Sequence, residues 1–428
     1  MTNQYSLLVD IGGTDIKVGV IEVGKSDLIN ISRYSTPTFL DLSSLKREIA
    51  PKILMQTCLA AISQAEKSFG QFKTIALSGQ MGCWLLTDAE NNPVSNIVSW
   101  QDKRSDERTS DGSSFRELAQ TKYGSNSLVL AGNETRSGLP LFGLFTSLHK
   151  SKKKEKFRFH SLISWVTSQL VRDHLYIVHE TDFASSGMFN VETKSKMDSL
   201  SGFFTNKLDF PEVTGEFIKV GKSFWGNSLI MIGVGDQQAS LYGSRLTAET
   251  VVVNIGTGGQ IASLLANYPG SPDLQVRPYF ENKLIQTKTH LPAGRAINSY
   301  LTSLTNQGTQ FLDYDGLYNL EIHDPSVLVP RNVSDFESDV LKIQNPKSLT
   351  EALKISEEIV FGFFIAYRDA LNKFEIHPPK DLTFAGGVGQ NFRALQKLLI
   401  QEFKLELQIA NTQESTLQGL ARLISIDE

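Results

Sequence analysis

The sequence has few cysteines and no apolar run long enough to cross a membrane. Only Cys58 and Cys83 are present among 428 residues, too few for a disulfide framework or a four-ligand zinc site. No apolar run approaches the roughly 20 residues of a spanning helix. The segment from Met1 to Asp10 has no basic region before its short apolar stretch, so it is not typical of a signal peptide. These absences predict a cytoplasmic, globular chain that does not insert into membranes.

An excess of positive charge is also missing. The chain carries 42 Lys and Arg against 46 Asp and Glu, which gives a formal net charge of −4. A dedicated nucleic-acid-binding protein would show a basic surplus, so this class is excluded. At roughly 150 residues per domain, the length predicts two or three domains.

Short β-rich runs alternate with segments of helical periodicity. The first run, from Tyr5 to Asp10, ends at a glycine turn and is followed by an alternating run from Ile16 to Glu22, which predicts a β-meander. Helical spacing begins at Pro51, and Gly70 stands where a helix would end. This alternation of strands and helices predicts an α/β architecture. Further expected strands cover 74–78, 84–87, 229–234, 250–255, 260–265 and 382–385, and further expected helices cover 161–171, 352–374 and 392–403.

The first glycine turn carries an acid, a hydroxyl and a cation. It reads Asp10-Ile11-Gly12-Gly13-Thr14-Asp15-Ile16-Lys17. Glycines in a tight hairpin let backbone N–H groups approach an anion, and the Thr14 hydroxyl adds a donor. Asp10 would repel a phosphate but could hold Mg²⁺ between itself and the phosphates. A simple β-turn is the alternative interpretation.

A similar turn appears in the second half, with an acid upstream of it. Val253 to Gln260 reads V-N-I-G-T-G-G-Q, and Asp236 follows an apolar strand and two glycines. An aspartate there could accept the proton of a hydroxyl that attacks phosphorus. The alternative role for Asp236 is the N-cap of a helix that begins at Gln237.

Two further segments of the chain contain glycines at motif-like spacing. Gly386-Gly387-Val388-Gly389-Gln390-Asn391 forms a third turn at the start of a helix, where glycine lets a flat ring lie against the backbone. Gly19 to Ser26 matches the G-x-x-x-x-G-K-[ST] pattern of a P-loop. Because this segment is itself an alternating strand followed by another β-like run, we interpret the match as a coincidence.

Together these residues resemble the FGGY carbohydrate kinases, a branch of the actin, Hsp70 and hexokinase superfamily. The turn at 10–17 resembles the first phosphate motif, 254–260 the second, and 386–389 the adenosine motif. Segments 76–82 (A-L-S-G-Q-M-G) and 100–104 (W-Q-D-K-R) resemble the sugar-pocket segments, and 181–189 resembles the family's T-D-x-x-x-A-S segment. The order of these motifs is kept from residue 5 to about residue 425.

The resemblance implies an α/β fold with two actin-like (ribonuclease H-like) domains, whose mixed β-sheets are flanked by helices, and a ligand cleft between them. The expected domains are 1–235, with the sugar pocket and the first phosphate turn, and 236–428, with the catalytic aspartate and the other two turns. Asp236 is expected to act as the base, and Asp10 and Asp236 to hold Mg²⁺, directly or through water. The expected ligand-binding residues are Gly12, Gly13, Thr14, Lys17, Gly256, Thr257 and Gly258 for the ATP phosphates, Gly386, Gly387 and Asn391 for adenosine, and Gln80, Met81, Trp100, Asp102, Arg104 and Gln237 for the sugar.

The resemblance has two departures near these sites. Gly82 stands where many ketose kinases of the family have histidine, so a hydrogen bond in the sugar pocket is missing or supplied elsewhere. Asp15 adds a negative charge beside the phosphate turn, so it must point outward or hold a water.

The function implied is an ATP-dependent sugar kinase, with sedoheptulose favoured as the substrate and xylulose next. The alternative is a nucleotide-binding regulator of the same fold with weak or lost turnover. The sugar-pocket segments argue against an actin- or Hsp70-like ATPase, because such a protein does not bind a sugar. The expected cofactors are ATP and Mg²⁺. The expected partners are a small sugar and, for assembly, a second copy of the chain as a homodimer, with neither nucleic acid nor membrane.

Overall fold

The computed structural model describes residues 4–42, 44–151, 155–173, 175–256, 258–269, 274–305, 312–322, 328–329, 346, 348–374, 380–410 and 414–427. The chain divides into two compact units, which we describe separately. The first unit comprises Met1–Gly243, Asn267–Leu284 and Glu414–Glu428, and the second comprises Ser244–Ala266 and Ile285–Gln413. The domain boundary expected after residue 235 stays a prediction. Within the described ranges, no helix is both long enough and apolar enough to cross a membrane.

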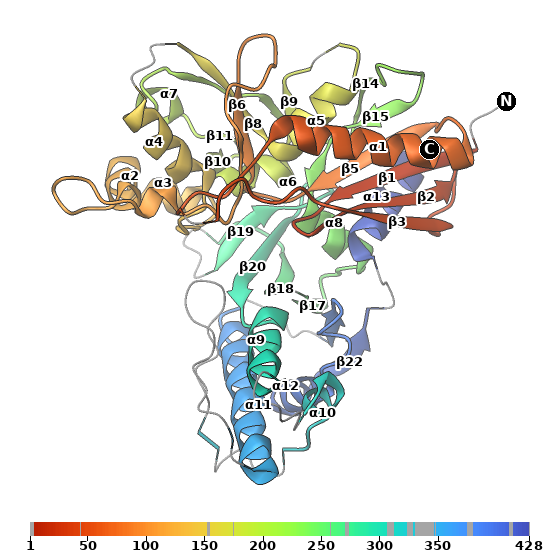
Figure 1. The fold of residues 1–428 in the computed structure, drawn as a ribbon, viewed down its shortest axis with the longest axis vertical. Coiled ribbons are helices and arrows are strands. Elements are labelled where there is room, and N and C mark those ends of the chain that lie inside the picture. The colour runs from red at the N-terminus through yellow and green to blue at the C-terminus, as the bar shows by residue number, and fades with distance from the viewer. Residues whose placement is uncertain are drawn as a thin grey trace. The chain divides into compact units, whose positions relative to one another are not determined.

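The first unit is built on a mixed sheet in the order β14-β15-β5-β1-β2-β3, with β16 also pairing with β5 (Figure 1). Its opening β1-β2-β3 meander is antiparallel, as predicted, and Asp10 on β1 lies opposite Lys17 on β2. On its other side β1 runs parallel to β5, where Asp10 lies opposite Ser78. The strands of this sheet are β1 (Tyr5–Ile11), β2 (Asp15–Glu22), β3 (Asn30–Ser35), β5 (Thr74–Gly79), β14 (Lys219–Lys222), β15 (Leu229–Met231) and β16 (Val234–Gly235).

Smaller sheets and most of the helices complete the first unit. A second sheet has the order β12-β8-β6-β7-β4, and the pairs β10-β11 and β13-β9 stand apart. These strands are β4 (Glu48–Ile49), β6 (Trp84–Thr87), β7 (Ile97–Val98), β8 (Phe157–Ser161), β9 (Ile177–His179), β10 (Phe189–Asn190), β11 (Ser195–Lys196), β12 (Leu208–Asp209) and β13 (Glu212–Thr214), and β19 (Gln275–Pro278) also belongs to this unit. The helices are α1 (Pro51–Phe69), α2 (Phe115–Tyr123), α3 (Ser125–Leu130), α4 (Pro140–Lys150), α5 (Leu162–Leu170), α6 (Glu180–Phe183), α7 (Leu200–Phe203), α8 (Asp236–Gly243) and α13 (Ser415–Asp427), with 3₁₀ turns at Arg104–Asp106 and Ala184–Ser186.

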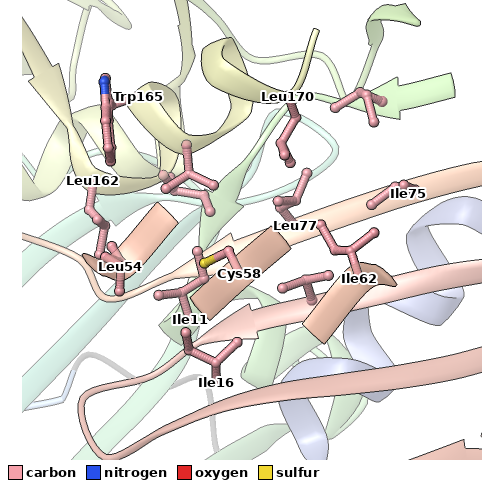
Figure 2. Packing of buried hydrophobic residues seen from close by; sticks show 14 of the residues in the cluster. Ile11, Ile16, Leu54, Cys58, Ile62, Ile75, Leu77, Leu162, Trp165 and Leu170 are labelled. Carbon is pink, nitrogen blue, oxygen red and sulfur yellow. The ribbon is translucent and has the colours of Figure 1, made fainter. Parts of the chain in front are cut away.

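Helix α1 covers this sheet and confirms the predicted helical period. It begins at Pro51 and ends at Phe69, and the next residue, Gly70, has a φ of 80°, which suits glycine. Leu54, Cys58 and Ile62 from its buried face join a core with residues of β1, β2 and β5, as Figure 2 shows. Burial raises the pKa of the Cys58 thiol to about 12, so this cysteine is a packing residue and not a reactive one.

The second unit repeats the same strand pattern. Strands β17 and β18 form an antiparallel hairpin, and β17 pairs in parallel with β21, as β1 does with β5. The sheet continues on both sides in the order β20-β18-β17-β21-β22. Its strands are β17 (Thr250–Ile255), β18 (Gly259–Leu265), β20 (Leu284–Leu291), β21 (Asp381–Ala385) and β22 (Glu406–Ile409), and its helices are α9 (Gly294–Thr305), α10 (Tyr314–Tyr318), α11 (Leu349–Leu371) and α12 (Arg393–Phe403).

The P-loop match is confirmed as a coincidence. Gly19 to Glu22 belong to β2, and the chain turns at Gly24 before it enters β3. A P-loop would need a helix after the loop, and here an edge strand follows instead.

Candidate functional site

Asp10 is a buried carboxylate at the end of the central strand. Its side chain is 4% exposed, and Ser78 on β5 donates a hydrogen bond to Oδ1 at 2.9 Å. Burial raises the pKa of Asp10 to about 6, and the ammonium group of Lys17 opposes this shift. The carboxylate is therefore held by one hydroxyl and one nearby cation, without the full set of donors that normally accompanies a buried charge.

Asp236 is brought to the same edge of the sheet by β16. This strand pairs with β5 at Ser78 and Gly79, so β5 lies between the strands that carry the two aspartates. Burial and the charge of Asp10 raise the pKa of Asp236 to about 7, against backbone N–H bonds from Gln237 and Met81 and the charge of Arg277. The proposed base thus titrates near neutral pH.

A third acid, Asp182, lies close enough to Asp236 for their charges to interact. It is 1% exposed on α6, and Ser161 donates a hydrogen bond to its Oδ2. Burial raises the pKa of Asp182 to about 7, with a further contribution from the charge of Asp236. The resemblance to the T-D-x-x-x-A-S segment marked this stretch, but no role was predicted for the aspartate itself.

The first phosphate turn is tight and partly exposed. The Gly12 N–H donates to the Asp15 carbonyl at 3.0 Å, and Gly13 and Thr14 at the tip are exposed. The Gly12 carbonyl accepts from the Thr36 hydroxyl at 2.8 Å and from Nε2 of Gln80 at 3.2 Å. Gln80, which was expected in the sugar pocket, therefore ties the sugar segment to the phosphate turn.

Asp102 and Arg104 form a buried network with each other. Arg104 donates to Asp102 through Nε at 2.7 Å and Nη2 at 2.9 Å, and Asp102 also accepts from the Arg47 N–H at 2.7 Å. Nη2 of Arg104 further bonds Glu48 at 2.6 Å, and Nη1 bonds Ser147 at 3.2 Å. These contacts fix Asp102 and Arg104 next to the segment that carries Trp100, and their place in the sugar pocket stays a prediction.

Trp100 lies beside the glycine that departs from the family pattern. Gly82 has a φ of 77°, and a Cβ built on it would lie 2.6 Å from Nη2 of Arg136 and 3.3 Å from the Trp100 Cβ. The Arg136 guanidinium lies 5.9 Å from the centre of the Trp100 ring, and its Nη1 donates to the Trp100 carbonyl at 2.8 Å. Arg136 thus fills the space that a residue-82 side chain would take.

A second arginine reaches Gln237 and Met81. Arg277 on β19 donates from Nη1 to Oε1 of Gln237 at 2.6 Å, and the same nitrogen lies 4.0 Å from the Met81 sulfur. Its Nη2 donates to Glu134 at 3.1 Å, and Glu134 also pairs with Arg136. Arg136, Glu134 and Arg277 therefore form two linked ion pairs through Glu134, and the charge of Asp236 acts on Arg277.

In the second unit, the second phosphate turn and the adenosine turn lie against each other. The N–H groups of Val388 and Gly389 donate to the Ile255 carbonyl at 3.0 and 2.9 Å. Gly386 has a φ of 77°, and a Cβ there would lie 2.5 Å from both the Ile255 carbonyl and the Asn254 side chain. A Cβ at Gly387 would meet nothing within 4 Å.

The remaining predicted residues of this unit have simpler positions. Gly256 donates to the Gly258 carbonyl at 3.0 Å, and a Cβ at Gly256 would also point into open space. The exposed Asn391 donates to the Gly387 carbonyl at 2.7 Å. Thr257 lies outside the described residues.

Sequence reasoning missed Glu134 and Arg136 and gave Arg277 no role in the site. The one signal that could have drawn attention to Arg277 is its place between Val276 and Pro278, the two apolar residues of a four-residue strand that begins with Gln275. Glu134 and Arg136 lie in a polar loop before α4, where charges are ordinary, so the sequence carries no such signal for them.

Comparison with solved structures shows the same fold over nearly the whole chain. A xylulose kinase from Lactobacillus acidophilus has a TM-score of 0.79 at 15% identity, covering 99% of this chain and 90% of that one. A gluconate kinase from the same organism has a TM-score of 0.76 at 15% identity, with coverages of 99% and 89%. The glycerol kinase of Plasmodium falciparum with ADP has a TM-score of 0.78 at 15% identity, with coverages of 99% and 90%. These likenesses confirm the predicted α/β fold with two actin-like domains.

No curated protein matches the chain. Comparison with models of protein families does identify a family. The model of the FGGY carbohydrate kinase N-terminal domain matches residues 5–243, which is more than half of the 428 residues. The chain therefore belongs to the FGGY family of carbohydrate kinases and is a phosphotransferase that acts on a sugar.

Proposed function

We propose that the protein transfers the γ-phosphoryl group of ATP to a sugar hydroxyl, with Asp236 as the general base. The observation that carries this proposal is the pair Asp10 and Asp236 on either side of β5, Asp10 on β1 and Asp236 directly after β16, with pKa values raised to about 6 and about 7. A general base works best when its pKa lies near the working pH, because it is then both ionised and able to hold a proton.

Phosphoryl transfer at Asp236 forms one bond to phosphorus, breaks another and moves one proton. The acceptor oxygen forms a bond to the γ-phosphorus, the bond between that phosphorus and the oxygen bridging to the β-phosphate breaks, and ADP leaves. The proton of the acceptor hydroxyl passes to the Asp236 carboxylate. The N–H groups of Met81 and Gln237 bond to this carboxylate and keep it oriented.

The residues fit one Mg²⁺ held mainly by the nucleotide. No group of three or more metal-ligating side chains occurs in the part of the chain that the structure describes. Mg²⁺ in such sites uses one or two carboxylates together with waters and phosphate oxygens, and Asp10 with Asp236 supplies two under-neutralised carboxylates. When bound, the ion would neutralise charge that develops on the phosphates.

The nucleotide is assigned to the glycine turns. Gly12, Gly13, Thr14 and Lys17 in the first unit, and Gly256, Thr257 and Gly258 in the second, are proposed to bind phosphates. The open space beside Gly387 supports a flat ring against that turn, with Gly386 and Asn391 shaping it. ADP in the Plasmodium falciparum glycerol kinase structure supports an adenine nucleotide here.

The acceptor is assigned to the region around Trp100, Met81 and Gln237, with Gln80, Asp102 and Arg104 supporting it. The sequence favours a ketose, sedoheptulose first and xylulose second. The three kinases compared above are named for xylulose, gluconate and glycerol, so the fold is compatible with acceptors of different chemistry.

The test is phosphorylation by the purified chain with Mg-ATP of sedoheptulose, xylulose, ribulose, fuculose, gluconate and glycerol. We expect turnover of at least one acceptor. Asp236→Asn should lose about 100-fold or more of kcat because the proton acceptor is removed, and it should still bind ATP because the glycine turns that hold the nucleotide are unchanged. Glu249→Gln is the matched control, since Glu249 is an exposed carboxylate paired with Lys380 on the surface.

The outcomes separate the two candidate functions. ATP binding without phosphorylation of any acceptor would favour the nucleotide-binding regulator. Full activity of Asp236→Asn would remove Asp236 from the role of base.

A further inference from the structure

The space beside Gly82 is occupied by a cation. Nη2 of Arg136 lies 2.6 Å from the place where a Cβ of residue 82 would be. The Arg136 guanidinium, which comes from another loop, therefore occupies the space that a side chain at position 82 would take.

Two of the three Arg136 nitrogens are fixed by protein acceptors. Nε bonds Glu134, and Nη1 donates to the Trp100 carbonyl at 2.8 Å. Among the described residues, none accepts a hydrogen bond from Nη2, and the side chain keeps 16% of its surface exposed. A guanidinium that is held at two nitrogens, with no described protein acceptor for the third, is preorganised to bind an acceptor group.

The charges around this edge do not cancel. Arg136 and Arg277 share the single carboxylate of Glu134, so the three side chains carry a net charge of 2 − 1 = +1. Glu134 and Arg277 are 5% and 9% exposed, which makes an unbalanced charge costly there. Asp236 is the other acid that acts on Arg277, whereas Arg136 forms an ion pair with Glu134 alone among the described residues.

We propose that the acceptor of this kinase is a sugar acid, whose carboxylate binds Nη2 of Arg136 beside Gly82. The inference rests on the proposed function, and it replaces the neutral ketoses that the sequence favours with an acidic acceptor. A carboxylate fits better than a hydroxyl because its negative charge attracts the guanidinium and can form an ion pair with it, whereas a hydroxyl offers only a neutral acceptor. It also balances the surplus positive charge of the Glu134, Arg136 and Arg277 cluster.

The first experiment compares matched acceptors with the wild-type protein and Mg-ATP. D-gluconate, D-xylonate and D-galactonate are each paired with the alditol that has CH₂OH in place of the carboxylate, and sedoheptulose and xylulose are added. We expect at least one acid to exceed its alditol and both ketoses in kcat/KM by about tenfold or more, as expected for one charged hydrogen bond.

The second experiment removes the charge at Arg136. Arg136→Gln should lower kcat/KM for the acid by about tenfold or more, mainly through KM, and leave the KM for ATP unchanged. Arg136→Lys should retain part of the affinity because it keeps the charge but not the planar fork. Arg108→Gln is the control, since the Arg108 side chain is 68% exposed in a surface ion pair.

Binding is measured separately from turnover. The three acids should raise the melting temperature of the wild-type protein, their alditols should not, and Arg136→Gln should lose this shift. Melting of the variants without ligand shows whether they remain folded.

The outcomes distinguish this inference from the proposed function. Efficient phosphorylation of a ketose with none of the three acids used would overturn the inference and leave the kinase mechanism standing. If no acceptor is phosphorylated, the proposed function fails, and the melting experiment alone decides whether the protein binds an acidic ligand through Arg136. An Arg136-dependent shift by an acid would then still support the acidic ligand, and no shift by any acid would overturn it.

Discussion

Nζ of Lys17 lies 2.9 Å from Oε2 of Glu414, although the two residues come from nearly opposite ends of the sequence. Glu414 also pairs with Arg33, and its side chain is only 4% exposed. The cation predicted to line the phosphates is thus held by an acid just before α13, and the C-terminal helix is tied to the β1-β2-β3 meander.

Removing the charge of Glu414 should destabilise the protein measurably. Glu414→Gln leaves Lys17 and Arg33 without their anionic partner, and we expect a loss of about 1–3 kcal/mol in the free energy of unfolding. Urea denaturation measures this loss. Glu22→Gln is the control, because Glu22 pairs with Lys25 where the side chains are 43% and 63% exposed, and such pairs contribute about 0–1 kcal/mol. Equal losses in both variants would contradict the interpretation.

The pH dependence of catalysis should follow Asp236. The base must be ionised to accept a proton, and its pKa is raised to about 7. We therefore expect kcat/KM for Mg-ATP, which reports the free enzyme, to fall as pH drops below about 7, by about tenfold per pH unit well below the pKa. A profile measured from pH 5 to 9 tests this, and a flat profile down to pH 5 would argue against Asp236 as the base.

Asp182 should make the protein less stable as pH rises through the weakly acidic range. Its folded-state pKa of about 7 exceeds the ordinary value of 3.8, so the folded protein binds the proton more tightly than the unfolded chain. The stability contributed by the protonated form is complete below about pH 4 and is lost as pH rises through about 7. Asp182→Asn cannot ionise, so its unfolding free energy relative to wild type should rise over this window by a few kcal/mol, on the order of 1.4 kcal/mol per pH unit at most. Denaturation at pH 4.5 and 7.5 measures the change, and a constant difference would refute it.

Gly82 should resist substitution for two separable reasons. Gly82→Ala places a Cβ on a residue with a φ of 77° and pushes against Nη2 of Arg136 at 2.6 Å. Gly112→Ala is a matched control, because Gly112 has a φ of 89° but a Cβ there would meet nothing within 4 Å. Both variants should lose about 1 kcal/mol through backbone strain, whereas only Gly82→Ala should also raise the KM for the acceptor. Unfolding curves and acceptor kinetics separate the two effects, and an unchanged acceptor KM in Gly82→Ala would argue against Arg136 at this site.

Two adjacent glycines of the adenosine turn should respond differently to alanine. In Gly386→Ala the new Cβ would lie 2.5 Å from the Ile255 carbonyl at a φ of 77°, so the turn must shift and stability should fall by about 1–3 kcal/mol. In Gly387→Ala the Cβ points into open space, so stability should remain within about 0.5 kcal/mol while the KM for ATP rises. Unchanged ATP kinetics in Gly387→Ala would contradict the placement of adenosine beside this residue.

Local signals predicted most of the secondary structure. Pro51 and Gly70 bound α1, and the two hairpins turn at glycines where the sequence places them. The long helix begins at Leu349, earlier than predicted, because Ser348 caps it by accepting from the Glu351 N–H, a signal the apolar period alone does not contain.

One predicted strand is divided in two by packing. The run 229–234 forms β15 and β16, with Ile232 and Gly233 between them. A Cβ at Gly233 would lie 2.5 Å from a side-chain carbon of Ile163 on α5, so the helix approaches the backbone closely at this point. The sequence contains the glycine but not the neighbour that explains it.

The sequence by itself determined the α/β class, the glycine turns, the two aspartates and the family, because each depends on residues adjacent in the chain or on a recognisable order of motifs. Only the tertiary structure decided what surrounds the acceptor region. Arg277 and Glu134 pair across 143 positions, and Arg136 fills the space beside Gly82 from another loop. Such contacts depend on how loops and strands pack together, and no periodicity or local propensity encodes them. The small number of cysteines excluded a disulfide framework, but only the tertiary structure shows that Cys58 and Cys83 are both buried.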